Sequence, residues 1–145
     1  MNSHNTAISR SNASAPLRML EKLGLLKGSV LDYGCGKGAD AKYLTEKGYL
    51  NDSYDPYWKP DELGDRKYDT VLCTFVLNVI ESTGEEELIK TLADRVGDGG
   101  RCFVTVRRDI KVDGPTTRGY QRNVLLNYPI IKELKGNYCI YEITK

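Results

Sequence analysis

The feature that most constrains the fold is a glycine-rich stretch directly after a short apolar run. Residues 29–33 (SVLDY) have the composition of a buried strand, and GCGKG follows at 34–38. Glycines permit positive φ and a close approach of the backbone to a ligand, while a following helix presents free amide hydrogens. We therefore expect a strand over 29–33, a ligand-binding turn, and a helix over 39–47 that Gly48 ends.

Strand and helix patterns alternate along the rest of the chain. Ser14 is a suitable cap for a first helix that starts at Ala15 or Pro16 and ends near Leu23. Thr83 and Glu86 form a capping box for a helix between the later strands. Further strands are predicted over 49–55, 68–77 and 101–107, the last after a turn over 97–100.

The C-terminal pattern differs, because two apolar runs at 128–134 and 137–144 are separated only by Lys135 and Gly136. This spacing predicts an antiparallel hairpin. Together the elements predict an α/β fold with a mostly parallel sheet that is covered on both faces. Ligands are then expected at the carboxyl ends of the strands.

Composition limits the chain to one domain over 1–145, since 145 residues with 40% hydrophobic and 28% charged residues suit a single globular core. The polar segment 1–14 is predicted to be mobile, and His4 within it to be solvated. No apolar run approaches the roughly 20 residues of a membrane span. The start also lacks the apolar stretch of a secretory signal, which predicts a cytoplasmic protein.

The four cysteines, at 35, 73, 102 and 139, are too far apart in sequence for a CxxC-type site. We expect small reduced core residues and no metal. Charge is uneven: residues 1–30 carry four basic and one acidic side chain, 31–100 carry eight and fifteen, and 101–145 carry nine and four. Basic ends around an acidic middle suit either an anionic partner such as nucleic acid or ordinary solvated faces.

Two acids give the glycine turn its meaning. Asp32 comes two residues before Gly34, and Asp55 follows at the end of the next predicted strand, where an acid can accept hydrogen bonds from ribose hydroxyls. Gly34, Gly36 and Ala39 also satisfy a dinucleotide fingerprint, so a nicotinamide cofactor competes. Asp32 favours a ligand with a cationic group, because its charge would repel a pyrophosphate.

The pattern DxGxGxG over 32–38 resembles motif I of the class I S-adenosylmethionine-dependent methyltransferases, and Asp55 resembles their ribose-binding acid. Residues 68–81 are similar to that family's fourth strand and cofactor-lining loop, and 97–101 to its turn into the fifth strand. The resemblance implies a Rossmann-like class I methyltransferase sheet and the cofactor S-adenosylmethionine. The cofactor-binding residues that we predict are Asp32, Tyr33, Gly34, Gly36, Gly38, Asp55, Pro56, Thr74, Phe75 and Asn78.

A narrower resemblance rests on short segments, and it points to the methyltransferases associated with DNA phosphorothioation systems. The segments lie at 6–10, 14–16, 55–56, 78–81 and 117–121.

The chain departs from the class I pattern between Asp55 and Tyr68, where twelve residues are too few for a helix, a third strand and a second helix. The sheet is thus predicted to be reduced between the second and fourth family strands. The usual adenine contact is then in doubt, and Tyr57, Trp58 or side chains near Phe75 are alternatives. The run DPYW at 55–58 also resembles the DPPY motif of amino-methylating DNA enzymes, but it follows the second strand instead of the fourth.

The acceptor side is less defined. Arg107 and Arg108 follow the strand over 101–107, and Tyr120 and Gln121 are further substrate candidates. No catalytic residue is assigned, since the sulfonium already makes the methyl group electrophilic and the protein mainly aligns the reactants. The sequence thus predicts methyl transfer to an unidentified acceptor, with nucleic acid as a candidate. The alternatives are a non-catalytic S-adenosylmethionine-binding module and an NAD-dependent oxidoreductase.

Overall fold

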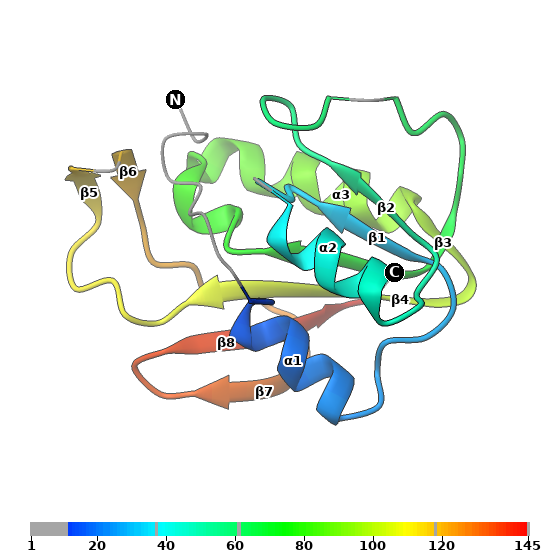
Figure 1. Cartoon of the computed structure of the whole chain (residues 1–145). Coiled ribbons are helices and arrows are strands. Elements are labelled where there is room, and N and C mark those ends of the chain that lie inside the picture. The colour runs from blue at the N-terminus through cyan, green and yellow to red at the C-terminus, as the bar shows by residue number, and fades with distance from the viewer. Residues whose placement is uncertain (1–11, 37, 61, 118, 145) are drawn as a thin grey trace.

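The main sheet has six strands in the order β2-β1-β3-β4-β8-β7 (Figure 1). A computed structural model of the chain describes residues 12–36, 38–60, 62–117 and 119–144. Four strands are parallel: β1 (Val30–Tyr33), β2 (Asn51–Tyr54), β3 (Tyr68–Thr74) and β4 (Val96–Arg107). The hairpin of β7 (Ile130–Leu134) and β8 (Tyr138–Ile143) pairs with β4 in the antiparallel sense through β8. The predicted mostly parallel sheet with an antiparallel end is confirmed.

Helices cover both faces of this sheet, as alternating strands and helices require. α1 (Ala15–Lys22) and α2 (Ala39–Glu46) lie on one face, where Leu20 and Leu44 pack with Phe103 of β4. α3 (Glu85–Asp94) lies on the other, where Leu92 packs with β-strand residues such as Val104. Figure 1 shows α1 beside the β7–β8 hairpin and α2 beside β1.

The start of α1 follows its capping signal. Ser14 accepts a hydrogen bond from the amide of Leu17 at 3.3 Å. The Ser14 amide and hydroxyl both donate to the carboxylate of Asp40 in α2, each at 2.7 Å. Ala13 and Ser14 are consequently buried, so the predicted mobile segment 1–14 does not extend to its last two residues. Residues 1–11, with His4, lie outside the described part of the chain.

The predicted capping box at Thr83 and Glu86 is wrong. A 3-10 turn, η3 (Ser82–Gly84), takes up Thr83, so α3 starts only at Glu85. Gly84 is its N-terminal flanking residue and gives no side-chain cap. The helix instead begins with three consecutive glutamates, which favour the positive end of the helix dipole.

The connection between β2 and β3 is short, as predicted. Among its described residues the only pairing is a bridge between Asp55 and Lys59. β2 is therefore an edge strand of the sheet. The predicted turn over 97–100 is present as an irregularity within β4, because Tyr68 faces Val96 but Thr70 faces Arg101.

Two features were not predicted. β5 (Gly114–Thr116) and β6 (Gly119–Gln121) form a separate two-stranded hairpin that extends beyond the carboxyl end of β4 (Figure 1). The strand predicted over 68–77 ends at Thr74, where Phe75 takes a left-handed backbone conformation and η2 (Leu77–Val79) follows. Both features lie at the end of the sheet where a ligand is expected.

Candidate functional site

The carboxyl ends of β1 and β2 are joined through the glycine turn. The amides of Gly34 and Cys35 both donate to the carbonyl of Tyr54, at 2.6 and 3.0 Å. The amide of Gly36 donates to Oδ2 of Asp55 at 2.9 Å. The two motifs singled out in the sequence, the turn and the acid that follows it, are thus in direct contact.

Asp55 also organises the residues that follow it. Its Oδ1 accepts hydrogen bonds from the amides of Tyr57, at 2.9 Å, and Trp58, at 3.0 Å. The two aromatic rings meet edge to face with centroids 4.8 Å apart. Tyr57 is 58% exposed and Trp58 40% exposed, so a large aromatic surface stands next to the turn. Pro56, which precedes the two aromatic residues, is exposed as well.

Gly34 packs against the segment that follows β3, which is the third part of the site after the glycine turn and Asp55. Its φ is 82°, and a Cβ at this position would lie 2.4 Å from Cγ2 of Val76. Only glycine allows both the backbone conformation and the contact with the segment after β3. Gly38 also has a positive φ, of 87°, but the space around it is open.

Phe75 marks the end of β3 with a φ of 63°. Non-glycine residues rarely adopt this conformation, and such strain is concentrated at functional sites. Its amide donates to the carbonyl of Thr105 in β4 at 2.9 Å, which holds the turn in place. Thr74 before it is half-buried, so Thr74 and Phe75 border the same end of the sheet as the glycine turn.

The electrostatics of the turn are acidic. Burial raises the pKa of the Cys35 thiol to about 12, and the negative charges of Asp32 and Asp55 contribute to this rise. Asp32 is only 3% exposed, and it acts on Cys35 of the turn through its charge. A negative field at this position favours a cationic ligand group and opposes a pyrophosphate.

The Tyr33 side chain faces the α3 side of the sheet. Its ring stacks on Tyr54 with centroids 4.9 Å apart, and both line a pocket of about 350 Å³ with Leu63 and Arg95. This pocket lies beside the shortened connection between β2 and β3. Burial raises the pKa of the Tyr33 hydroxyl, with a further contribution from Tyr54.

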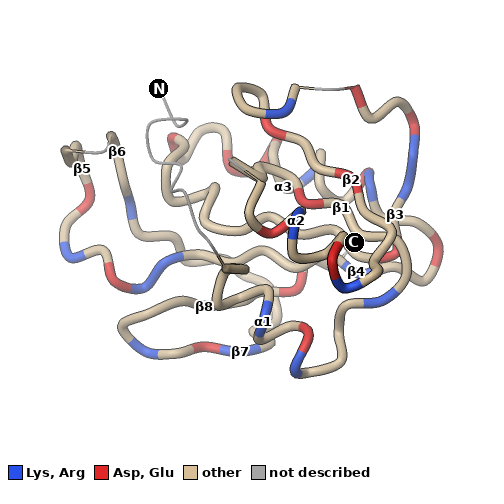
Figure 2. Tube along the Cα trace, in the orientation of Figure 1, with Lys and Arg blue, Asp and Glu red and all other residues tan. Residues whose placement is uncertain are grey.

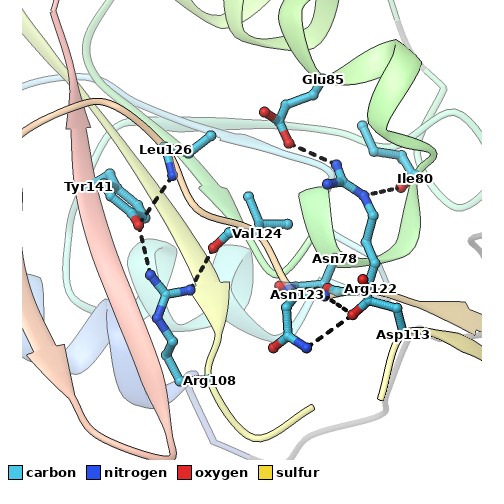
Figure 3. Close-up of polar contacts among 10 residues, drawn as sticks. All are labelled: Asn78, Ile80, Glu85, Arg108, Asp113, Arg122, Asn123, Val124, Leu126 and Tyr141. Carbon is cyan, nitrogen blue, oxygen red and sulfur yellow. Dashed lines mark hydrogen bonds and ion pairs between the residues drawn. The ribbon is translucent and has the colours of Figure 1, made fainter. Parts of the chain in front are cut away.

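Asn78 occupies a different place from the one expected of a cofactor contact. It is fully buried, and its Oδ1 accepts from the amide of Arg107 at 2.7 Å. Its Nδ2 donates to the carbonyl of Arg122 at 2.9 Å (Figure 3). The side chain therefore links backbone segments within the protein and presents no surface to a ligand.

The predicted acceptor residues divide into two kinds. Arg108 belongs to the fold, because its guanidinium donates to the Val124 carbonyl and the Tyr141 hydroxyl, each at 2.7 Å, and pairs with Glu133 (Figure 3). Arg107 is more exposed and forms a two-bond ion pair with Asp109. Tyr120 and Gln121 lie half-buried in β6.

Ion pairs neutralise part of the positive charge of residues 101–145. Arg101, Arg107, Arg108 and Arg122 are paired with Glu142, Asp109, Glu133 and Glu85. Basic and acidic residues also alternate along the connection from β4 to β5 (Figure 2). The charge difference seen in the sequence does not translate directly into one basic surface.

Three further properties of the described residues concern metal ligands, membrane-spanning helices and free thiols. They contain no group of three or more histidine, cysteine, aspartate or glutamate side chains that could hold a metal ion. Their helices are all too short or too polar to cross a membrane. Cys73, Cys102 and Cys139 are buried free thiols, as predicted, whereas Cys35 is half-buried in the glycine turn.

Comparison with known proteins identifies the family. A family model described as a methyltransferase domain matches residues 4–139, which is most of the chain. The chain belongs to this methyltransferase family. Its members are S-adenosylmethionine-dependent enzymes, so S-adenosylmethionine is the cofactor. A search of curated proteins found no significant match.

Solved structures support the same fold. The methyltransferase domain aligns with the Burkholderia thailandensis 1,6-didemethyltoxoflavin-N1-methyltransferase at a TM-score of 0.62 and 14% identity, over 87% of this chain and 74% of that one. It aligns with the magnesium protoporphyrin IX methyltransferase of Synechocystis PCC 6803 at 0.55 and 20%, over 88% and 75%. A protein studied for conversion of a disulfide bond into a thioacetal group during echinomycin biosynthesis gives 0.56 and 22%, over 68% of this chain but only 50% of that chain.

The site fits a cationic cofactor on its own evidence. The methyltransferase domain combines a glycine turn open at Gly38, a buried negative charge below it, and a carboxylate held at its edge. S-adenosylmethionine carries a sulfonium and an ammonium that such a field attracts, and a ribose that a carboxylate can bind.

Proposed function

We propose that this protein binds S-adenosylmethionine across the glycine turn and transfers its methyl group to an acceptor at the carboxyl end of β4. The observation that carries the proposal is the hydrogen bond from the Gly36 amide to Asp55, which brings the ribose-binding acid to the edge of the turn. The carboxylate of Asp55 already accepts from the amides of Gly36, Tyr57 and Trp58. A carboxylate has about four acceptor positions, so one remains for a ribose hydroxyl.

The other predicted cofactor residues take distinct roles. The backbone of Gly34, Gly36 and Gly38 lets the methionine part approach, and the charge of Asp32 favours its ammonium. The bound cofactor supplies a methyl group on a cationic sulfur. The protein then needs to hold the acceptor in line with that methyl group and to exclude competing water.

For the adenine we propose the exposed Tyr57–Trp58 pair. It directly follows Asp55, and aromatic faces of this size bind a flat base well. The shortened connection between β2 and β3 supports this arrangement, because its described residues contain no strand that could supply an adenine contact.

For the acceptor we propose nucleic acid, with a role in DNA phosphorothioation systems. The proposal rests on the sequence resemblance and on the net positive charge of residues 101–145. Arg101, Arg108 and Arg122 are held in ion pairs within the fold. For the binding surface we therefore propose the exposed Lys111 and also Arg107, whose ion pair with Asp109 lies partly in solvent.

Titration calorimetry with S-adenosylhomocysteine, S-adenosylmethionine and NAD tests the cofactor. We expect micromolar or tighter binding of the first and none of NAD, and saturable NAD binding alone would refute the proposal. Transfer of a labelled methyl group to DNA and RNA then tests the acceptor. Cofactor binding without DNA or RNA binding even at low salt would point to a small-molecule or protein acceptor. Binding without any transfer would favour the non-catalytic module.

A further inference from the structure

The β5–β6 hairpin extends beyond the carboxyl end of β4, and the residues before β5 and after β6 join it to the rest of the protein (Figure 1). Its base is closed by Asp113, which accepts from the amide of Asn123 at 2.8 Å and from its Nδ2 at 3.0 Å. Pro115, Thr116 and Thr117 are exposed. Arg122, the residue directly after β6, connects the hairpin to the segment that follows β3.

Arg122 is unusually buried for an arginine, at 7% exposure. Its Nε donates to the carbonyl of Ile80 at 2.7 Å, and its Nη2 pairs with Glu85 at 2.9 Å (Figure 3). Its amide donates to the carbonyl of Asn78 at 2.8 Å. A buried cation is costly unless it is fully paired, so this arrangement holds the hairpin in one position.

Asn78 completes the connection from the other side. Its side chain binds the carbonyl of Arg122 and the amide of Arg107, which ends β4. Two residues before Asn78, Val76 lies against Gly34 of the glycine turn. A short run of packed groups thus leads from the cofactor turn to the hairpin.

We propose that Asn78 and Arg122 are positioning residues that couple the cofactor turn to the β5–β6 hairpin, and that this hairpin forms one wall of the acceptor site. The inference rests on the proposed function. Cofactor binding at the turn restricts the motion of the segment 75–80. The hydrogen bonds of Asn78 and Arg122 then restrict the motion of the hairpin as well. Tyr120 and Gln121, the predicted acceptor residues of β6, are the groups that this coupling places.

Hydrogen exchange measured by mass spectrometry, with and without saturating S-adenosylhomocysteine, tests the coupling. In the natural protein we expect the ligand to slow exchange in the turn and also in both hairpin strands, the latter by about fivefold, a modest value for coupled sites. Arg122→Lys keeps the charge but loses the forked geometry. It should abolish the slowing in the hairpin, keep that in the turn, and change the S-adenosylhomocysteine Kd by less than about threefold.

Two further variants make the test specific. Glu85→Gln removes the charge of the partner while it keeps an acceptor oxygen, so it should reduce the hairpin effect partially. Arg101→Lys disrupts a comparable forked pair, with Glu142 on β8, and should leave the hairpin effect intact. Equal slowing in the natural protein, Arg122→Lys and Glu85→Gln would overturn the coupling, as would a hairpin that never responds. In either case the turn would still respond and the proposed function would stand, whereas a protein that binds no S-adenosylhomocysteine would contradict both.

Discussion

The two sides of the carboxyl edge of the sheet use charged residues in opposite ways. On the side of β1 and β2, Asp32 and Asp55 surround a glycine turn and create a negative field at its surface. On the side of β4, Arg108 and Arg122 point inward and hold chain segments together. A charged residue after a strand can therefore shape a binding surface or hold irregular chain segments together. The hydrogen-bond partners of its side chain distinguish the two roles.

The difference has a structural cause. On the α3 face, the described connection between β4 and β7 contains the small β5–β6 hairpin and no helix. The segment 122–128 covers this part of the core with Val124 and Leu126, and its carbonyl and amide groups need partners. Arg108 and the Tyr141 hydroxyl supply them. The arginines thus replace the hydrogen bonds that a helix would have made internally.

The largest effect is expected from a methyl group at Gly34. Gly34→Ala combines a left-handed backbone with a clash against Val76, and we expect a loss of about 3 kcal/mol in the free energy of unfolding and no measurable S-adenosylhomocysteine binding. Gly38→Ala is the control, since it has the same backbone strain in open space and should cost only about 1 kcal/mol. Urea denaturation and calorimetry measure the two quantities. Equal losses in both variants would show that the contact with Val76 is unimportant.

Arg108→Met tests the opposite side. It leaves the carbonyl of Val124 without its side-chain donor and the hydroxyl of Tyr141 with only the Leu126 amide, and we expect the free energy of unfolding to fall by about 2 to 3 kcal/mol. The Kd for S-adenosylhomocysteine should stay within about twofold of the natural value, because this side serves the fold. A folded variant of unchanged stability would contradict this structural role and support the prediction that Arg108 binds the acceptor.

Asp55→Ala sharpens the role of the acid at the turn. It removes the acceptor that we propose for the ribose and the acceptor of the Gly36, Tyr57 and Trp58 amides. The binding free energy of S-adenosylhomocysteine should therefore weaken by about 1 to 3 kcal/mol while the fold survives. Trp58, the only tryptophan, lies three residues away and reports binding by its fluorescence. Unchanged affinity would move ribose recognition elsewhere and favour the amino-methylating interpretation of residues 55–58.

The smallest effect is expected at Arg107, whose pair with Asp109 is partly exposed. Arg107→Ala should change the free energy of unfolding by less than about 1 kcal/mol. Its binding to a DNA or RNA duplex should weaken, and the salt dependence of that binding should become shallower, since one fewer phosphate is neutralised. Affinity measured at several salt concentrations checks this, and an unchanged salt slope would remove Arg107 from the acceptor surface.

Local signals predicted much of the fold. The apolar run before Gly34 became β1, the cap at Ser14 starts α1, and the spacing of the C-terminal runs predicted the β7–β8 hairpin. The twelve residues after Asp55 also predicted the missing strand. These features depend on residues close in sequence, for which backbone preference and hydrophobic spacing suffice.

The sequence by itself determined the turn, the two acids and the family, because glycine conformation and strand order restrict what can follow a buried strand. Tertiary structure alone decided that Asn78 is buried, that Arg108 bonds to the Val124 carbonyl, and that Gly34 meets Val76. It also decided that Glu85, and not a capping box, starts α3 and pairs with Arg122. These outcomes join residues 16 to 44 positions apart in the chain. Packing sets a side chain's partner at such a distance, whereas local propensity depends only on neighbouring residues.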